Sequence, residues 1–217
     1  MPRAPRLASS PARSGQATAW SSLRLRDRIG PGLRVLFVGI NPGVRSAEIG
    51  HHFAGYSNRF WKLLWESGLV AEPITFEHDD RLPEFGFGIT NLIARPSPGI
   101  NDLSPSEYGE GWQTLERKIR RYRPEIVALV GVTLYRAIEP LVIADADRPA
   151  RAARLSRQVR LGPQAMTIHG AQVFVLPNPS GRNANFSYGE MLAAFRLLRR
   201  RINARPPRRA RAGGAST

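Results

Sequence analysis

Three polar loops hold the side chains of this chain that could do chemistry. They read GINPG at residues 39–43, ITNLIARPSPG at 89–99 and LPNPSG at 176–181. Their amides, hydroxyls and Arg suit the recognition of a planar heterocycle through its polar edge. Asn-Pro segments are also ordinary turn formers, so one such loop alone would indicate only a bend in the chain. Three of them together favour a binding site.

Other chemistries lack their parts in this sequence. There is no cysteine, which excludes disulfides, thiol nucleophiles and iron–sulfur clusters. The four His form no HExxH pattern, and the chain has no phosphate-binding glycine loop or nucleophile elbow. The three loops also contain no carboxylate pair. We therefore expect neither a metal nor a cofactor.

The formal charge of +15 is concentrated at the two ends of the chain. Residues 1–28 carry six Arg and one acid, and residues 199–217 carry seven Arg and no acid. Residues 29–198 are nearly balanced, with 19 bases and 16 acids. Such ends are attracted to a polyanion such as nucleic acid without reading its sequence, although simple solvated tails would have the same composition.

Short apolar runs alternate with amphipathic stretches along the chain. We expect strands at 35–40, 88–93, 126–132 and 173–176, and helices at 58–68, 104–122, 133–138 and 187–202. Two of these helices begin with capping-box spacing, Ser104 with Glu107 and Ser187 with Glu190. Residues 144–164 are polar and Arg-rich, and we expect a loop there.

This alternation predicts an α/β fold, a three-layer α/β/α sandwich around a mainly parallel sheet. Ligands bind outside the carboxyl ends of such strands, so the loops at 39–43 and 176–181 should share one rim. We expect one domain at 29–203 between flexible basic arms at 1–28 and 204–217. No apolar run suits a secretory signal or a membrane span, so we expect a soluble, cytoplasmic protein.

Four motifs carry a resemblance to a known family. In chain order they are GINPG at 39–43, HHFAGYSNRFW at 51–61, GITNLIARPSPG at 88–99 with NDLS at 101–104, and LPNPSG at 176–181. Together they resemble the mismatch-specific uracil and thymine DNA glycosylases, over about residues 32–198. The resemblance implies the uracil-DNA glycosylase fold and excision of a base that is flipped out of the double helix.

The resemblance also implies a role for each matching residue. Asn41 matches the family Asn that holds the attacking water beneath the sugar C1′ atom. An amide cannot take a proton as a carboxylate does, so the base must depart early and water must capture a cationic sugar. The backbone around Ile40 would help to hold a carbonyl of the leaving pyrimidine.

Four further positions match the family's base pocket. Phe53 stands where the family aromatic stacks on the flipped base, although a core Phe is the structural alternative. Asn91 matches the side chain that bonds the polar edge of the pyrimidine and helps to exclude cytosine, or else it caps a strand end. Ser97 stands where a family Thr lies near the pocket. His52 is expected on the pocket wall or at the surface rather than as a general base.

The segment NPSGRNANF at 178–186 resembles the family's intercalation loop. Arg182 is the candidate wedge that fills the space left by the flipped nucleotide, and a simple phosphate contact is the alternative. Asn178, Ser180 and Gly181 are expected to support this loop and the DNA phosphates. Because extrusion costs less for a mispaired base, a wedge would favour G·U and G·T mismatches.

The sequence thus predicts a monofunctional glycosylase that needs no cofactor and acts on double-stranded DNA with G·U or G·T mismatches. A lyase step is not expected, because Lys62 and Lys118 both fall in predicted helices. We expect a monomer that leaves an abasic product for downstream repair proteins, located at the nucleoid in a prokaryote. Three alternatives remain: a glycosylase for uracil, hypoxanthine or etheno bases in any context, a non-catalytic mismatch or abasic-site binder, and a basic RNA-binding protein.

Overall fold

A five-stranded sheet forms the centre of the part of the chain that the computed structural model describes, residues 19–145 and 159–204. The strand order is β2-β1-β3-β5-β4, and every neighbouring pair is parallel except β4 with β5. The strands are β1 (Val35–Gly39), β2 (Phe87–Asn91), β3 (Ile126–Val130), β4 (Gly162–Ile168) and β5 (Ala171–Leu176). The predicted α/β class and mainly parallel sheet are therefore confirmed.

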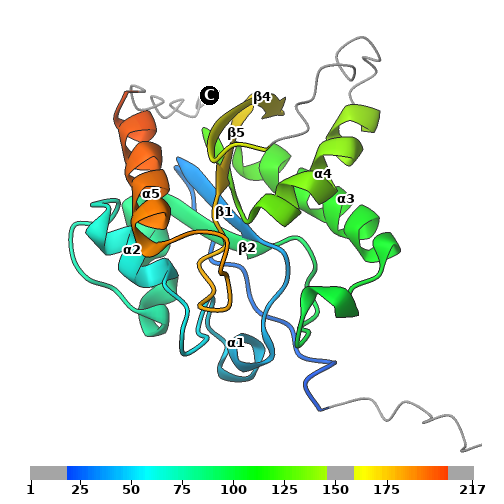
Figure 1. Ribbon diagram of the computed structural model, residues 1–217. Helices are drawn as coiled ribbons and strands as arrows, with labels where there is room; N and C mark the ends of the chain where they lie inside the picture. Colours follow the sequence, from blue (N-terminus) through cyan, green and yellow to red (C-terminus); the bar gives the residue numbers. More distant parts are fainter. Residues whose placement is uncertain (1–18, 146–158, 205–217) are drawn as a thin grey trace, which may run out of the picture.

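Helices cover both faces of this sheet (Figure 1). On one face lie α2 (Phe60–Glu66) and α5 (Tyr188–Asn203), and on the other lie α3 (Pro105–Tyr122) and α4 (Val132–Asp145). Each face has its own apolar core, because successive strand residues point to opposite sides. Phe37 packs with α2 and α5, whereas Leu36 packs with α3 and α4. Burial on both faces explains why β1 and β3 are apolar throughout.

The two predicted capping boxes open their helices. Ser104 precedes α3 and Ser187 precedes α5, and in each case the backbone N–H of the capping Ser donates to the Glu three residues later. These contacts satisfy N–H and hydroxyl groups that the first helical turn cannot pair. Helix α3 ends at Tyr122, where Arg123 takes a left-handed conformation ahead of Pro124.

Part of the predicted loop at 144–164 is wrong. Gly162 begins β4, which pairs antiparallel with β5 across a tight turn at His169 and Gly170, and both turn residues have positive φ. The sequence hides this strand because it lies at the sheet edge and alternates buried and exposed residues over a short length. Helix α4 also runs further than predicted, to Asp145, and passes through Pro140. Residues 146–158 lie outside the described residues.

The packed chain begins earlier than the boundary expected at residue 28. Leu25 is buried, and Arg28 exchanges two backbone hydrogen bonds with Ile89 beside β2. Residues 1–18 and 205–217, which make up most of the predicted arms, lie outside the described residues. Three short helices were not predicted: α1 (Val44–Ile49), η1 (Phe76–Phe85) and η2 (Ile100–Asp102). No helix among the described residues is long and apolar enough to cross a membrane.

Gly111 lets α3 lie directly against the chain that follows β2. A Cβ atom there would lie 2.5 Å from the backbone oxygen of Leu92, so Gly111→Ala must push the helix away. We expect a loss of about 1–3 kcal/mol in the free energy of unfolding, measured by urea denaturation. Gly109 is the matched control, because it lies in the same helix with open space around its Cβ position. Gly109→Ala should be neutral or stabilising by about 0.5–1 kcal/mol, and equal effects of the two substitutions would contradict the close contact.

Candidate active site

Asn41 lies two residues beyond the end of β1, with its amide held in one orientation. Its Nδ2 donates to Ser97 Oγ at 2.8 Å, to the Pro42 carbonyl at 3.1 Å and to the Arg95 carbonyl at 3.4 Å. Since a carbonyl can only accept, the nitrogen of the amide must face these groups. No donor among the described residues bonds the Asn41 Oδ1 atom. That oxygen is therefore free to accept a hydrogen bond from a ligand or a water molecule.

Ser97 supports Asn41 from a buried position. Its hydroxyl accepts from Asn41 and donates to the Gly99 carbonyl at 2.6 Å, and its backbone N–H donates to the Pro42 carbonyl at 3.2 Å. The loop after β2 is thus joined to the loop after β1. The sequence predicts that Ser97 lies near the base pocket, and in the structure its hydroxyl contacts the Asn41 amide and the Gly99 carbonyl.

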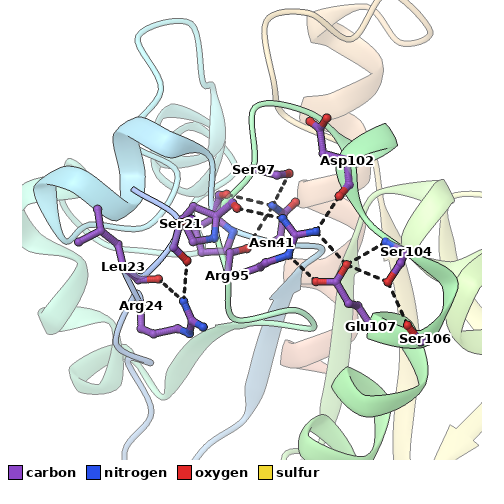
Figure 2. Close-up of polar contacts among 12 residues, drawn as sticks. Ser21, Leu23, Arg24, Asn41, Arg95, Ser97, Asp102, Ser104, Ser106 and Glu107 are labelled. Carbon is purple, nitrogen blue, oxygen red and sulfur yellow. Dashed lines mark hydrogen bonds and ion pairs between the residues drawn. The ribbon is translucent and has the colours of Figure 1, made fainter. Parts of the chain in front are cut away.

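A charged pair fixes the loop that carries Ser97. Arg95 donates from Nη2 to Glu107 Oε2 at 2.8 Å and to the Asp102 carbonyl at 2.6 Å (Figure 2). Glu107 is the capping-box residue of α3, and its carboxylate also accepts from the Ser104 backbone. Chiefly through the Arg95 hydrogen bond, the pKa of Glu107 falls to about 2. The pair therefore stays ionised at neutral pH and ties the site loop to a helix.

Gly39, the last residue of β1, is the point where two other predicted residues meet. It lies opposite Asn91 in the parallel register of β1 and β2. A Cβ atom on Gly39 would lie 2.5 Å from Asn91 Oδ1 and 3.6 Å from Phe53 Cζ. The structure thus brings the Asn91 amide and the tip of the Phe53 ring together above the strand end. No described residue hydrogen-bonds the half-buried side-chain amide of Asn91, which suits a group that awaits a ligand.

Phe53 combines a strained backbone with an ordered ring. Its φ angle of 52° lies in the left-handed region, which a bulky residue rarely adopts. Its ring stacks on Phe60 with a centroid distance of 4.2 Å and an interplanar angle of 23°. Phe60 belongs to the core, whereas Phe53 is half-buried at its edge. Phe53 thus packs against the core and is also partly exposed, and its role as a pocket residue stays a prediction.

His52 does not lie at the surface, and that part of the prediction is wrong. It is buried, and its ring Nε2 lies 3.0 Å from the Arg26 carbonyl, so Nε2 must carry the proton. Burial lowers the pKa of His52, which keeps the ring neutral at neutral pH. The ring is engaged with the backbone through Nε2, and the expectation that His52 is not a general base stays a prediction. Its place in a pocket wall stays a prediction.

The loop after β5 is held by its own side chains. Asn178 Oδ1 accepts from the Ser180 N–H at 3.0 Å, and Asn183 Nδ2 donates to the Asn178 carbonyl at 2.8 Å. The Arg182 N–H donates to Ser180 Oγ at 3.3 Å. The Arg182 side chain is exposed, and its guanidinium makes no hydrogen bond with the described residues. The loop therefore presents Arg182 outward, as an intercalating or phosphate-binding residue requires.

Gly181 joins this loop to the segment that follows Phe53. A Cβ atom on Gly181 would lie 2.4 Å from the Cβ atom of Ser57, so only glycine allows the contact. The Arg59 N–H also donates to the Pro179 carbonyl at 3.0 Å. The predicted intercalation loop and the predicted base-pocket segment therefore form one surface.

Sequence reasoning missed an exposed pair beside Phe53. The Tyr56 ring is 90% exposed, and the Arg45 guanidinium lies 3.9 Å from its centroid and donates to its hydroxyl. A groove of about 440 Å³ lies beside this pair, and Phe53 and Trp65 are among the residues that line it. Tyr56 sits inside the HHFAGYSNRFW motif, but exposure of one ring in an aromatic-rich motif leaves no pattern in the sequence.

Among residues 19–145 and 159–204, no group of three or more His, Asp or Glu side chains could hold a metal ion. The groups that the rim presents are the Asn41 and Asn91 amides and the Phe53 ring, with the buried Ser97 hydroxyl bonded to Asn41. They can grip a planar base and orient a water molecule.

Comparison with known proteins shows the family of this chain. The family model of the uracil DNA glycosylase superfamily matches residues 27–200, so the chain belongs to that superfamily. Its members hydrolyse N-glycosidic bonds in DNA, which makes this chain a DNA glycosylase by family. The solution structure of a "putative Uracil DNA glycosylase" from Methanosarcina acetivorans shares the fold, with a TM-score of 0.50 and 16% sequence identity. That match covers 82% of this chain and 98% of the other.

Gly39→Ala tests whether Asn91 and Phe53 form one site. The new methyl group would displace the Asn91 amide, which is the end of a movable side chain, so the protein should still fold. We expect uracil release from DNA to slow by about 10- to 100-fold, because a misplacement of about 1 Å has that effect on a reacting geometry. Gly43→Ala is the control in the same loop, since nothing lies within 4 Å of its Cβ position. Equal rates for the two variants would show that Asn91 does not contact the base.

Proposed function

We propose that this protein is a monofunctional DNA glycosylase that flips uracil mispaired with guanine out of the double helix and hydrolyses its N-glycosidic bond. Thymine and other damaged pyrimidines opposite guanine are proposed as further substrates. The observation that carries the proposal is the Asn41 amide, whose nitrogen is bound to three acceptors while its oxygen is left open. Such an oxygen can orient a water molecule without removing its proton.

The chemistry follows from that limit. The bond between the sugar C1′ atom and the base N1 atom breaks first, and its electron pair leaves with the base. The resulting base anion needs donors along its edge, and the Asn91 amide and the backbone around Ile40 are suited to supply them. Water held by Asn41 then bonds to the cationic C1′ atom and releases a proton to solvent. Phe53 would stack on the flipped base, with its other neighbour being the core ring of Phe60.

We propose that there is no lyase step because of where the two lysines of the chain lie. Lys62 pairs with Glu66 at 3.5 Å and Lys118 pairs with Asp27 at 2.6 Å. Lys118 also donates to the Thr90 hydroxyl in β2. A lysine that attacks C1′ must be neutral and free, whereas both of these face carboxylates. Hydrolysis by water alone fits these contacts best.

We propose the mismatch preference because of the position of the loop that carries Arg182. Its guanidinium is exposed, and the glycine contact with Ser57 fixes the loop beside the Phe53 segment. A side chain in this place can fill the space left by an extruded base. We further propose that the enzyme acts as a monomer, at the cytoplasmic nucleoid in a prokaryote, and leaves its abasic product to downstream repair proteins.

Asn41→Ala tests the proposed chemistry. We expect the single-turnover rate of uracil release to fall by roughly 100-fold or more, because the water loses its orienting acceptor. Binding to a duplex that contains an abasic site should be retained, since Asn41 is not part of the loop that faces the DNA. Ser97→Ala should show a smaller loss of rate, because it removes only one of the three acceptors of the amide. A rate of uracil release equal to wild type in Asn41→Ala would contradict the proposed mechanism.

A panel of duplexes tests the mismatch preference. Single-turnover excision would be measured on G·U, A·U, G·T and G·C pairs and on single-stranded uracil, with wild type and with Arg182→Ala. We expect G·U to be cut fastest, G·C to be left intact, and Arg182→Ala to lose rate by roughly 10-fold on duplexes but not on single strands. Arg200→Ala, which removes an exposed charge at the far end of α5, is the control.

Other outcomes of this panel point elsewhere. Equal cutting of A·U, G·U and single-stranded uracil would mean that the enzyme reads uracil alone, and the wedge assignment of Arg182 would fail. No excision from any substrate, with abasic-site binding retained, would indicate a non-catalytic binder. Retention of RNA without either activity would indicate an RNA-binding protein.

A further inference from the structure

The backbone on the N-terminal side of Phe53 is clamped by two side chains. The His52 N–H donates to Asp79 Oδ2 at 2.8 Å, and the His52 carbonyl accepts from Trp61 Nε1 at 3.1 Å. Both contacts are buried. A left-handed aromatic residue persists only where its surroundings impose that conformation. His52 thus has both its backbone groups fixed immediately before the strained residue.

The backbone on the C-terminal side is clamped in the same way. The Ala54 N–H donates to Ser46 Oγ at 3.1 Å, and the Ala54 carbonyl accepts from Arg45 Nε at 2.8 Å. Four backbone groups around Phe53 therefore bond to side chains rather than to a strand or helix ladder. These four contacts flank the left-handed residue on both sides.

Asp79 differs from the other three in carrying a fully buried charge. It lies in η1, 0% exposed, and receives Arg28 Nε at 2.8 Å and His51 Nδ1 at 3.2 Å on its second oxygen. Arg28 also donates to the Gly50 carbonyl at 3.1 Å. A buried carboxylate of this kind is costly unless it is paired and hydrogen-bonded. Here its bonds hold residues 50–52, the chain that leads into Phe53.

We propose that Asp79 is a positioning residue for base excision. It holds the His52 N–H and, through Arg28, the Gly50 carbonyl, and so keeps Phe53 in the left-handed conformation that places its ring beside Asn91. Asp79 itself touches neither the base nor Asn41. This inference rests on the proposed function, because it takes Phe53 to be the ring that stacks on the flipped base.

A double-mutant cycle separates this role from a general structural one. In otherwise wild-type protein, Asp79→Asn should slow single-turnover uracil release by about 10- to 100-fold. Phe53→Leu, which keeps an apolar contact but removes the aromatic face, should slow it by roughly 10-fold. If Asp79 acts through Phe53, adding Asp79→Asn to Phe53→Leu should have little further effect. The proposal would be overturned if the rate losses of the two single variants multiply in the double variant, or if Asp79→Asn alone has no effect on the rate.

Asp80→Asn is the matched control, since it makes the same chemical change at the neighbouring, exposed carboxylate. It should leave the rate unchanged. Ser46→Ala is a milder variant for the case in which Asp79→Asn fails to fold, because it removes only the acceptor of the Ala54 N–H. It too should slow excision in wild type and have little effect in Phe53→Leu. If the rate losses of Ser46→Ala and Phe53→Leu multiply in the double variant, the inferred clamp on Phe53 would be contradicted.

Amide hydrogen exchange of residues 51–54 provides a readout that does not depend on activity. Asp79→Asn should speed exchange in this segment at least 10-fold relative to Asp80→Asn, while exchange in β1 and β3 stays unchanged. Unchanged exchange at 51–54 would overturn the positioning role even if excision is observed. If the wild-type protein excises no base but Asp79→Asn still speeds exchange at residues 51–54, the proposed function fails while the clamp stands.

Discussion

The missing side chain at Gly39 is the constraint on which the site depends. Because β1 ends without a Cβ atom, the Asn91 amide can lie across the strand end and the Phe53 ring can reach the same place. Parallel pairing of β1 with β2 sets Asn91 opposite Gly39. Asn41 follows two residues later, as soon as the chain leaves the sheet. One glycine thus allows the Asn91 amide, the Phe53 ring and the Asn41 amide to share one rim, as their proposed roles require.

The proposed mechanism relies on a weak catalytic group, the Asn41 amide. An amide cannot act as a general base, so the protein must gain rate from orientation and from stabilising the departing base. Accordingly, neighbouring groups hold Asn41, Ser97 and the backbone beside Phe53 in place. Asn41 is bound through its nitrogen, Ser97 is bound to the Gly99 carbonyl, and the loop that carries Ser97 is tied to α3 by the Arg95–Glu107 pair. The backbone on either side of Phe53 is bonded by four side chains, those of Arg45, Ser46, Trp61 and Asp79.

Much of this arrangement could be read from the sequence, because it depends on local patterns. Apolar runs that end in Asn-Pro turns mark the strand ends, and capping-box spacing marks the starts of α3 and α5. The family motifs place Asn41, Phe53 and Asn91 in chain order, and the structure brings these residues to one rim. The edge strand β4 was missed because its exposed residues alternate with half-buried or buried ones over a short length, which resembles a polar loop.

The supports of the site were missed for a different reason. Asp79 lies 26 positions beyond Phe53, in a polar 3₁₀ segment without periodicity, and nothing local links it to His52. Arg28 fell inside a run of Arg that looked like part of a tail, yet it pairs with a buried carboxylate. Such contacts join distant segments through single side chains. They follow from the tertiary fold and leave no repeat, spacing or composition that a single sequence can show.

The most direct test of the account is a crystal structure of the Asn41→Ala variant bound to a duplex that contains a G·U pair. We predict an intact uracil nucleotide flipped from the helix, its ring against Phe53 and its polar edge at the Asn91 amide, with the sugar C1′ atom facing the place of the lost Asn41 side chain. A uracil that stays stacked in the duplex, or one that is bound away from Phe53 and Asn91, would contradict it.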